Sequence, residues 1–262
     1  MTKRFEGKVA LVTGGARGIG AATARLLREQ GAIVAIADLP GAGGEAMASD
    51  IGAVFHALDV VQEDEWRRVL ARLVADTGGL DVLVNAAGIV GDSVNGALDR
   101  ISLAEWRRVL AVNLDGTFLG CREAVAHMRE QGRGGAIVNL ASVGAYYPTP
   151  QNVAYGASKA AVTNLTKSVA LFAAEGGHRI RCNSVHPGMI ETPMFKQIVS
   201  EISQRAIATA SKGAQSSMER MPLGAPGKPE EVAAMIAFLA SDEAAYVTGS
   251  EFTVDGGWRL LR

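Results

Sequence analysis

The stretch Val9-Ala-Leu-Val-Thr-Gly-Gly-Ala-Arg-Gly-Ile-Gly20 decides the fold of this chain. Its apolar and β-branched start predicts a buried strand, and the segment that follows it, Ala21–Gln30, has the pattern of a helix. Between them the glycines are spaced G-x-x-x-G-x-G, at Gly14, Gly18 and Gly20. This spacing differs from the G-x-G-x-x-G fingerprint, and glycine turns also serve plain strand-to-helix packing. A glycine turn between a buried strand and a helix nevertheless favours binding of a dinucleotide pyrophosphate.

Short apolar runs alternate with helical patterns along the rest of the chain. Ser102 and Glu105 form a capping box at the start of the amphipathic segment Leu103–Met128, and Pro229 opens a late helix. The predicted strands after the first are Ile33–Ala37, Ala53–Leu58, Val82–Asn85, Ala136–Leu140, Ile180–Val185 and Glu251–Val254. Strands that are apolar on both faces and separated by helices form a parallel, doubly wound sheet. The sequence therefore predicts an α/β fold with a sheet of seven parallel strands and helices on both faces.

The length and the charge of the chain narrow the class of protein. Its 262 residues suit one α/β domain over residues 1–262, and its formal net charge is -1. Without a basic stripe or a polybasic segment, neither nucleic acid nor a membrane surface is an expected partner. Cys121 and Cys182 lie in apolar segments, which indicates free thiols in a reducing compartment. Met1–Phe5 runs straight into the first strand without the pattern of a signal peptide, so we expect a soluble, cytoplasmic protein.

One segment, Met189–Lys228, is long for a connection without a strand, and we expect it to form a substrate-binding lid or pocket wall. Its apolar side chains, Met189 and Met194 among them, can mould to an apolar ligand. Packing of the segment against the sheet explains the same composition equally well. Tyr147, which follows Ser142 closely, is a further candidate for the pocket wall.

Asp38 ends the second predicted strand. A carboxylate at this position can accept hydrogen bonds from both ribose hydroxyls of an adenosine, and it repels a 2′-phosphate. The following Leu39 supplies no compensating cation, so the pair favours NAD over NADP. Two observations leave the question open: Asp38 also suits a helix cap or turn, and Arg17 in the glycine turn is able to meet a phosphate.

Tyr155 and Lys159 are spaced i and i+4, so on a helix their phenol and ammonium groups are neighbours. We expect the cation to lower the pKa of the tyrosine from about 10 toward neutral pH, which suits a general acid/base. A lone pair of this kind is common on ordinary helices. Together with Ser142 and the predicted dinucleotide turn, the pair indicates hydride transfer.

These motifs occur in the order seen in short-chain dehydrogenases/reductases, and the chain resembles this family over nearly its whole length. The residues that carry the resemblance are Thr13–Gly20, Asn85–Gly88, Asn113, Ser142, Tyr155, Lys159, Pro187-Gly188 and Thr248–Gly257. The resemblance implies a Rossmann fold and hydride exchange between a secondary alcohol or ketone and a nicotinamide cofactor, here NAD.

The resemblance also implies a role for each catalytic residue. Tyr155 exchanges a proton with the substrate oxygen, and Lys159 lowers the pKa of Tyr155 and binds the nicotinamide ribose. Ser142 holds the substrate oxygen by a hydrogen bond. Asn113 steadies a water that links Lys159 to solvent.

The implied cofactor contacts extend from the glycine turn to the lid. Asp59 and Val60 lie against the adenine, and Ile190 and Thr192 contact the nicotinamide carboxamide. The full set of expected cofactor contacts is Gly14, Arg17, Gly18, Ile19, Gly20, Asp38, Leu39, Asp59, Val60, Asn85, Ala86, Ala87, Gly88, Tyr155, Lys159, Pro187, Gly188, Ile190 and Thr192. The residues expected to bind substrate are Ser142, Tyr147, Tyr155, Met189 and Met194.

The substrate is predicted from what the lid segment offers. No arginine is obviously placed to hold a carboxylate or phosphate, which favours a neutral, hydrophobic secondary alcohol or its ketone. Ser184–Met194 looks similar to the same stretch in bacterial hydroxysteroid dehydrogenases, which supports a cyclic or steroid-like substrate. An NADPH-dependent 3-oxoacyl thioester reductase of the same family is the alternative enzyme. A non-catalytic nucleotide-sensing protein on the same fold is the alternative of another class.

Two further expectations concern metals and assembly. The four histidines show no ligand spacing with cysteine or acid, so no metal site is predicted. His186, directly before Pro187, is interpreted as a structural residue at the end of a strand. The resemblance implies a homotetramer in which the apolar helices predicted at Leu103–Met128 and Val153–Ala174 form a subunit interface.

Overall fold

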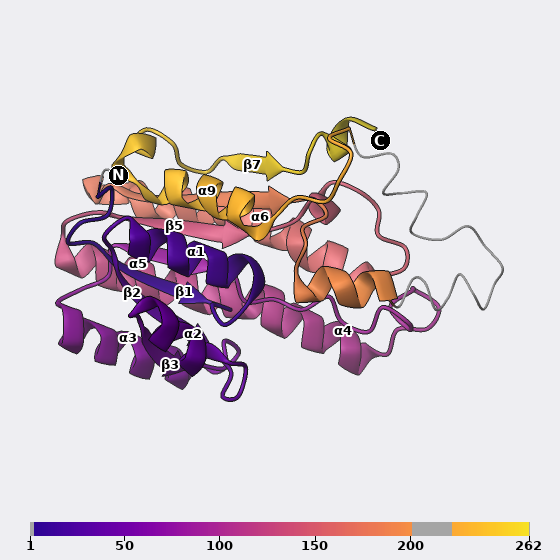
Figure 1. The fold of residues 1–262 in the computed structure, drawn as a ribbon, viewed down its shortest axis with the longest axis horizontal. Helices are drawn as coiled ribbons and strands as arrows, with labels where there is room; N and C mark the ends of the chain where they lie inside the picture. Colours follow the sequence, from indigo (N-terminus) through magenta and orange to yellow (C-terminus); the bar gives the residue numbers. More distant parts are fainter. Residues whose placement is uncertain (1–2, 201–221, 262) are drawn as a thin grey trace.

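The computed structural model describes residues 3–200 and 222–261, and a parallel sheet forms its centre (Figure 1). The strands follow the order β3-β2-β1-β4-β5-β6-β7, and all neighbouring pairs are parallel. Their bounds are β1 (Val9–Thr13), β2 (Ile33–Asp38), β3 (Val54–Ala57), β4 (Val82–Asn85), β5 (Gly135–Leu140), β6 (Ile180–Pro187) and β7 (Glu251–Val254). The predicted α/β fold with a doubly wound, seven-stranded parallel sheet is confirmed.

Helices cover both faces of the sheet because its strands are apolar on both faces. Leu83 of β4 packs into the core cluster of one face, whereas its neighbours Val82 and Val84 pack into the other. Burial of one such side chain stabilises the fold by about 1.5–3 kcal/mol. One face carries α1 (Gly18–Glu29), α2 (Gly44–Ile51) and α9 (Pro229–Ala240), and the other carries α3 (Glu63–Thr77), α5 (Gly116–Gln131) and α6 (Val153–Ala174). None of the described helices is long and apolar enough to cross a membrane.

The order of the strands reverses between β1 and β4, because the chain crosses the sheet after β3 and continues beside β1. Ligands of doubly wound sheets bind outside the carboxyl ends of the strands at such a switch point. β1 ends at Thr13, directly before the glycine turn, and β4 ends at Asn85, directly before the loop Ala86–Gly88. The topology therefore brings these two loops together at one edge of the sheet.

The segment Leu103–Met128 is not the single regular helix that its pattern predicts. It is divided into α4 (Leu103–Leu110), a π-helical stretch at Ala111–Asp115, and α5. Hydrophobic periodicity does not reveal one wider turn, which is why the sequence did not show it. Such stretches occur frequently at functional sites, and this one contains Asn113, which is fully buried.

The predicted lid, Met189–Lys228, is described only at its two ends, because residues 201–221 lie outside the described residues. Residues 193–200 are helical. Ile190 and Gly227 form an isolated parallel bridge, in which the Glu191 N–H donates to the Gly227 carbonyl (2.8 Å) and the Gly227 N–H to the Met189 carbonyl (2.9 Å). Backbone hydrogen bonds thus join the two ends of the segment at its base.

Candidate active site

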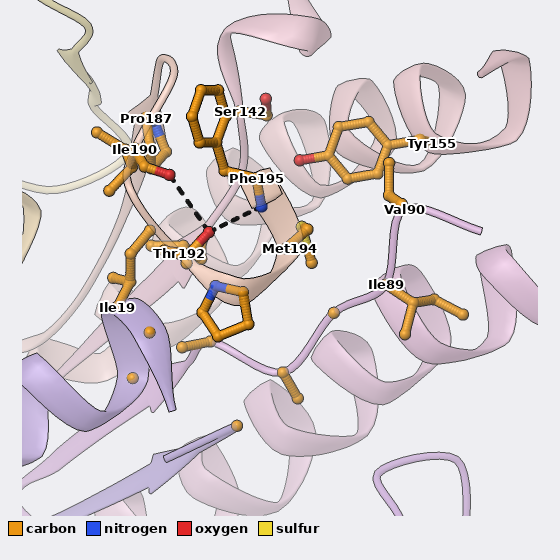
Figure 2. A pocket seen from close by; sticks show the side chains of 18 of the residues that line it. Ile19, Ile89, Val90, Ser142, Tyr155, Pro187, Ile190, Thr192, Met194 and Phe195 are labelled. Carbon is orange, nitrogen blue, oxygen red and sulfur yellow. Dashed lines mark hydrogen bonds between the residues drawn. The ribbon is translucent and has the colours of Figure 1, made fainter. Parts of the chain in front are cut away.

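A cavity of about 870 Å³ opens at the carboxyl ends of the strands, where the switch point predicts a ligand site (Figure 2). Of the residues predicted from the sequence, those that line it are Gly14, Arg17, Gly18, Ile19, Gly20, Asp38, Leu39, Asp59, Val60, Ala86, Ala87, Gly88, Ser142, Tyr155, Lys159, Pro187, Gly188, Met189, Ile190, Thr192 and Met194. The remaining three, Asn85, Asn113 and Tyr147, are not part of its wall. One cavity therefore contains both the expected cofactor contacts and the expected acid/base.

The spacing of the glycine turn has a steric cause. Gly14 has a positive φ of 63°, and a Cβ at this position would lie 2.7 Å from the backbone of Ala87. A Cβ on Gly20 would in turn collide with the carbonyl of Gly14. The turn and the loop after β4 are thus packed backbone to backbone. The hydroxyl of Thr13 completes this junction by accepting the N–H groups of Ala86 and Ala87, both at 3.2 Å.

The position of Asp38 is compatible with both predicted roles, as a turn-stabilising residue and as an acceptor for the ribose hydroxyls. One carboxylate oxygen accepts the Ala16 N–H (3.0 Å) and the other accepts the Leu39 N–H (2.8 Å), so the side chain stabilises the glycine turn and the end of β2. Asp38 also lines the cavity, where its charge is presented next to the turn. Arg17, at the N-cap of α1, is exposed and lines the same end of the site without capping the helix.

Asn85 is placed differently from the prediction. It is buried under the sheet, where its amide donates to the Asn139 side-chain oxygen (2.9 Å), and the cavity wall begins only at Ala86. Successive residues at the end of a strand point to opposite faces, so the motif Asn85–Gly88 does not contact the cavity as a unit. The Asn85 side chain thus supports the central strand, and of this motif Ala86, Ala87 and Gly88 line the cavity.

Ser142 and Tyr155 are brought together from the end of β5 and the first turn of α6. Figure 2 shows the Tyr155 hydroxyl directed into the cavity on the side where Ser142 lies. The Ser142 hydroxyl lowers the pKa of Tyr155 by favouring its ionised form. The Oγ of Ser142 also accepts the Gly144 N–H (3.1 Å). A hydroxyl that accepts from the backbone can also donate its own hydrogen.

The pKa of Tyr155 departs from the expectation. Burial raises it above the usual value, and the hydrogen bond with Ser142 only partly offsets that increase. Burial also lowers the pKa of Lys159, to about 8. The lysine is thus not among the causes that shift the pKa of Tyr155, and burial, which disfavours the charged form, is the largest cause for both residues.

Asn113 and Lys159 converge beside Gly88. The Asn113 amide donates to the Ile89 carbonyl and to Ser158 Oγ, both at 2.9 Å, and its oxygen accepts the Ile89 N–H at 2.8 Å. A Cβ on Gly88 would lie 3.3 Å from this oxygen and 3.4 Å from the Lys159 amino group. Glycine thus leaves a small space flanked by an acceptor and a donor.

The other end of the cavity is apolar. Its wall includes Met189, Met194, Phe195, Ile198 and Val199. The Thr192 hydroxyl fixes the start of this wall, since it donates to the Ile190 carbonyl (3.3 Å) and accepts the Phe195 N–H (3.2 Å), as the dashed lines in Figure 2 show.

Tyr147, which is predicted to bind substrate, is not among the described residues that line the cavity. Its hydroxyl donates to the carbonyl of Arg259, more than a hundred residues away along the chain. Val90, Thr149 and Trp258 also line the cavity, although they were not predicted from the sequence. Of these three residues, Trp258 could have been predicted, because it directly follows the Gly256-Gly257 motif that the family resemblance includes. Among the described residues, His, Cys, Asp and Glu form no group of three or more that could hold a metal ion.

A family model described as enoyl-(acyl carrier protein) reductase matches residues 14–259. Together with the relatives below, this match shows that the chain belongs to the short-chain dehydrogenase/reductase family. The chain is accordingly an oxidoreductase of secondary alcohols or ketones that uses a nicotinamide cofactor.

The names of the individual relatives refer to several different substrates. The chain is 40% identical over 260 residues to a 3-beta-hydroxysteroid dehydrogenase from Comamonas testosteroni, covering 97% of both chains. It is 42% identical over 259 residues to a 3-alpha-(or 20-beta)-hydroxysteroid dehydrogenase from Mycobacterium tuberculosis, covering 98% of this chain and 91% of that one. A 3-oxoacyl-[acyl-carrier-protein] reductase from Thermotoga maritima is 40% identical over 97% of this chain and 98% of its own. The crystal structure of levodione reductase superimposes with a TM-score of 0.91 at 32% identity, over 99% of this chain and 100% of that one.

Proposed function

We propose that this chain is an NAD-dependent dehydrogenase that interconverts a hydrophobic, cyclic or steroid-like secondary alcohol and its ketone. The observation that carries the proposal is one cavity with the Asp38 carboxylate beside the glycine turn, an apolar wall at the other end, and Tyr155 between them. Two of its relatives are named hydroxysteroid dehydrogenases, which supports the same substrate class.

The residues at the glycine turn fit a dinucleotide. The absence of a side chain on Gly14 lets the turn pack closely against the loop after β4, and the N-terminus of α1 follows the turn, where its dipole and free N–H groups suit a pyrophosphate. Asp38 would accept the ribose hydroxyls and repel a 2′-phosphate, and Leu39 brings no positive charge. A nicotinamide cofactor supplies the hydride acceptor or donor when it is bound.

The proton steps belong to the protein. Ser142 would donate its hydroxyl hydrogen to the substrate oxygen, while its Oγ accepts the Gly144 N–H. Tyr155 takes the proton from the alcohol during oxidation and returns it during reduction. Lys159, whose amino group donates to the Leu140 carbonyl (2.7 Å), would hold the nicotinamide ribose and stabilise the tyrosinate. The space between Asn113 and Lys159 beside Gly88 would hold the water that passes the proton onward.

The charges around the cavity favour a neutral substrate. Arg108 lines the cavity, but the Glu105 carboxylate holds its guanidinium with hydrogen bonds of 2.7 and 2.8 Å. The described apolar wall next to Ser142 carries methionine, phenylalanine, isoleucine and valine. Burial of such side chains against a rigid hydrophobic ring system contributes to binding in proportion to the apolar area removed from water.

Reduction of a 3-oxoacyl thioester is the second candidate. It is favoured by the relative from Thermotoga maritima and by the description of the family model. This reaction would use NADPH, so the negative charge of Asp38 and the apolar Leu39 argue against it.

We further propose that residues 1–262 act as one domain in a cytoplasmic homotetramer. Phe118 of α5 and Leu171 and Phe172 of α6 are apolar, and 43%, 76% and 54% of their surfaces are exposed. Two helices with exposed apolar side chains suit a subunit interface. The buried free thiols Cys121 and Cys182 suit a reducing compartment.

The decisive experiment measures turnover of cyclic, aromatic and steroid alcohols with NAD and with NADP, followed by the absorbance of the reduced cofactor. We expect the highest efficiency with a cyclic or steroid alcohol and NAD. Higher efficiency on a 3-oxoacyl thioester with NADPH would favour the second candidate. Cofactor binding without turnover of any compound would indicate a nucleotide-sensing protein.

A further inference from the structure

His186 lies behind the active site, on β6, and is completely buried. Its Nδ1 lies 3.2 Å from the backbone carbonyl of Ser142, and its Nε2 lies 2.8 Å from the hydroxyl of Ser184. The ring thus connects the strand that ends at Pro187 to the backbone of the residue whose side chain faces the substrate.

These two contacts define the tautomer of His186. A carbonyl oxygen can only accept a hydrogen bond, so Nδ1 carries a proton, and in a neutral ring Nε2 accepts the hydrogen of Ser184 Oγ. Burial lowers the pKa of His186, and Arg259 and Lys159 act in the same direction. The Ser142 carbonyl and the Glu251 carboxylate, which lies 4.0 Å from Nε2, act in the opposite direction. Burial is the largest of these effects and favours the neutral ring.

The ring of His186 is also fixed by stacking. Tyr146 packs against it with a distance of 4.7 Å between ring centroids and an angle of 20° between ring planes. The guanidinium carbon of Arg259 lies 4.0 Å from the centroid of the same tyrosine ring. Arg259 is fixed in turn, because its N–H donates to Asp255 (2.7 Å) and its carbonyl accepts the Tyr147 hydroxyl. A continuous series of contacts therefore leads from the C-terminal segment to Ser142.

We propose that His186, as the Nδ1–H tautomer, is a positioning residue for Ser142, and that Arg259 acts on the same serine through Tyr146 and His186. The inference rests on the proposed function, in which Ser142 holds the substrate oxygen. The physical reason is that the peptide group of Ser142 determines where its Oγ lies. A displacement of about 1 Å in a catalytic group can lower a rate by about a hundredfold.

The first test compares His186→Leu with His186→Asn. Leucine fills the space but donates nothing, whereas the asparagine amide can place an N–H where Nδ1 lies. We expect His186→Leu to lower kcat by about tenfold or more, with the dissociation constant of NADH unchanged within about twofold, and His186→Asn to regain kcat to within about threefold of the wild type. Equal kcat values for wild type and His186→Leu would overturn the proposal. Equal losses in both variants, or a parallel loss of NADH binding, would indicate a purely structural residue and would overturn it as well.

The second test needs no substrate and no variant. The nitrogen-15 chemical shifts of the imidazole distinguish the Nδ1–H tautomer, the Nε2–H tautomer and the imidazolium. We expect the Nδ1–H form in the wild-type protein at pH 7, and either of the other forms would overturn the proposal. This measurement also separates the two hypotheses: a protein that is inactive on every alcohol refutes the proposed function, whereas an active protein with the wrong tautomer refutes only the positioning role.

The third test concerns the C-terminal segment. Arg259→Ala removes the guanidinium from Tyr146, while Leu260→Ala changes a side chain that is 87% exposed in the same short helix. We expect Arg259→Ala to lower kcat by about threefold to tenfold and Leu260→Ala to leave it unchanged. Equal kcat in the two variants would overturn the part of the proposal that concerns Arg259.

Discussion

The amino group of Lys159 lies 5.8 Å from the ring centroid of Tyr155 and donates to the carbonyl of Leu140. Lysine and tyrosine are thus neighbours on α6, as their spacing predicts, yet both are buried, and burial opposes the charged form of each. With a pKa of about 8 the Lys159 amino group is still charged at pH 7, whereas the raised pKa of Tyr155 keeps the phenol protonated and neutral. This relationship motivates the first two predictions.

Tyr155→Phe removes the proton carrier and keeps the ring. Positioned acid/base groups contribute about a hundredfold to ten-thousandfold to a rate, so we expect kcat to fall by at least about two orders of magnitude. NADH binding, measured by fluorescence, should remain close to that of the wild type. If Tyr155→Phe turned over a substrate within about tenfold of wild type, another group would have to carry the proton.

Lys159→Met tests the burial of the ammonium group through the stability of the fold. The pKa of Lys159 is lowered to about 8, so between that value and the ordinary lysine pKa the unfolded chain binds more protons than the folded chain. The free energy of unfolding of the wild type should therefore rise with pH between these two pKa values. Below the lower value Lys159 is charged in both states, so the full cost of burying its charge lowers the stability there. We expect Lys159→Met to be more stable at pH 7, by up to about 3 kcal/mol less the lost hydrogen bond to Leu140. Urea unfolding at several pH values measures this, and a difference that does not change with pH would contradict it.

Asp38→Ser together with Leu39→Arg should shift the cofactor preference toward NADP. The exchange removes the charge that repels a 2′-phosphate and adds one that attracts it, so we expect the ratio of kcat/KM for NADP over NAD to rise by at least about tenfold. Because the Asp38 carboxylate also accepts the Ala16 and Leu39 N–H groups, some stability should be lost. A wild type that already prefers NADP would refute the assignment of NAD.

Gly14→Ala should weaken cofactor binding beyond the cost of an unfavourable φ. The added Cβ would lie 2.7 Å from the Ala87 backbone, so the glycine turn and the loop after β4 must separate. Gly52→Ala is a matched control, because Gly52 has a similar φ of 65° at the end of α2 but its Cβ would meet only Arg28 at 3.6 Å or beyond. We expect the unfavourable φ to lower the free energy of unfolding of both variants by about 1 kcal/mol. Only Gly14→Ala should also weaken NADH binding, by about tenfold. Equal NADH affinity in the two variants would contradict this account.

The proposed assembly can be tested at α6. Leu171→Glu places a charge on a side chain that is 76% exposed within the expected interface, whereas Leu98→Glu changes one that is 81% exposed and outside it. We expect light scattering to give the mass of a tetramer for the wild type and for Leu98→Glu, and a smaller mass for Leu171→Glu, because a buried unpaired charge is costly. A monomeric wild type at micromolar concentration would end this hypothesis.

The fold was accessible from the sequence because strands that are apolar on both faces have few alternatives to a parallel sheet. β1, β4 and β7 have the predicted bounds, and the differences elsewhere concern the ends of strands and the π-helical stretch at Ala111–Asp115. Along a motif, the sequence shows the order of residues but not the face on which each side chain lies, so it did not reveal that the Asn85 side chain points away from the cavity. The contact of the Tyr147 hydroxyl with Arg259 was not accessible from the sequence, because Arg259 belongs to a distant segment. The pKa of Tyr155 depends on burial, which is a property of the packed structure.

The bridge between Ile190 and Gly227 has a consequence for how this scaffold diversifies. The hydrogen bonds that close the base of the segment join backbone atoms, so this closure does not depend on the side chains that follow Thr192. Longer insertions there add little entropic cost, because loop-closure entropy grows only slowly with length. If the segment binds substrate as we propose, we expect its exchange between relatives to transfer a substrate preference and to leave Tyr155 and the glycine turn unchanged.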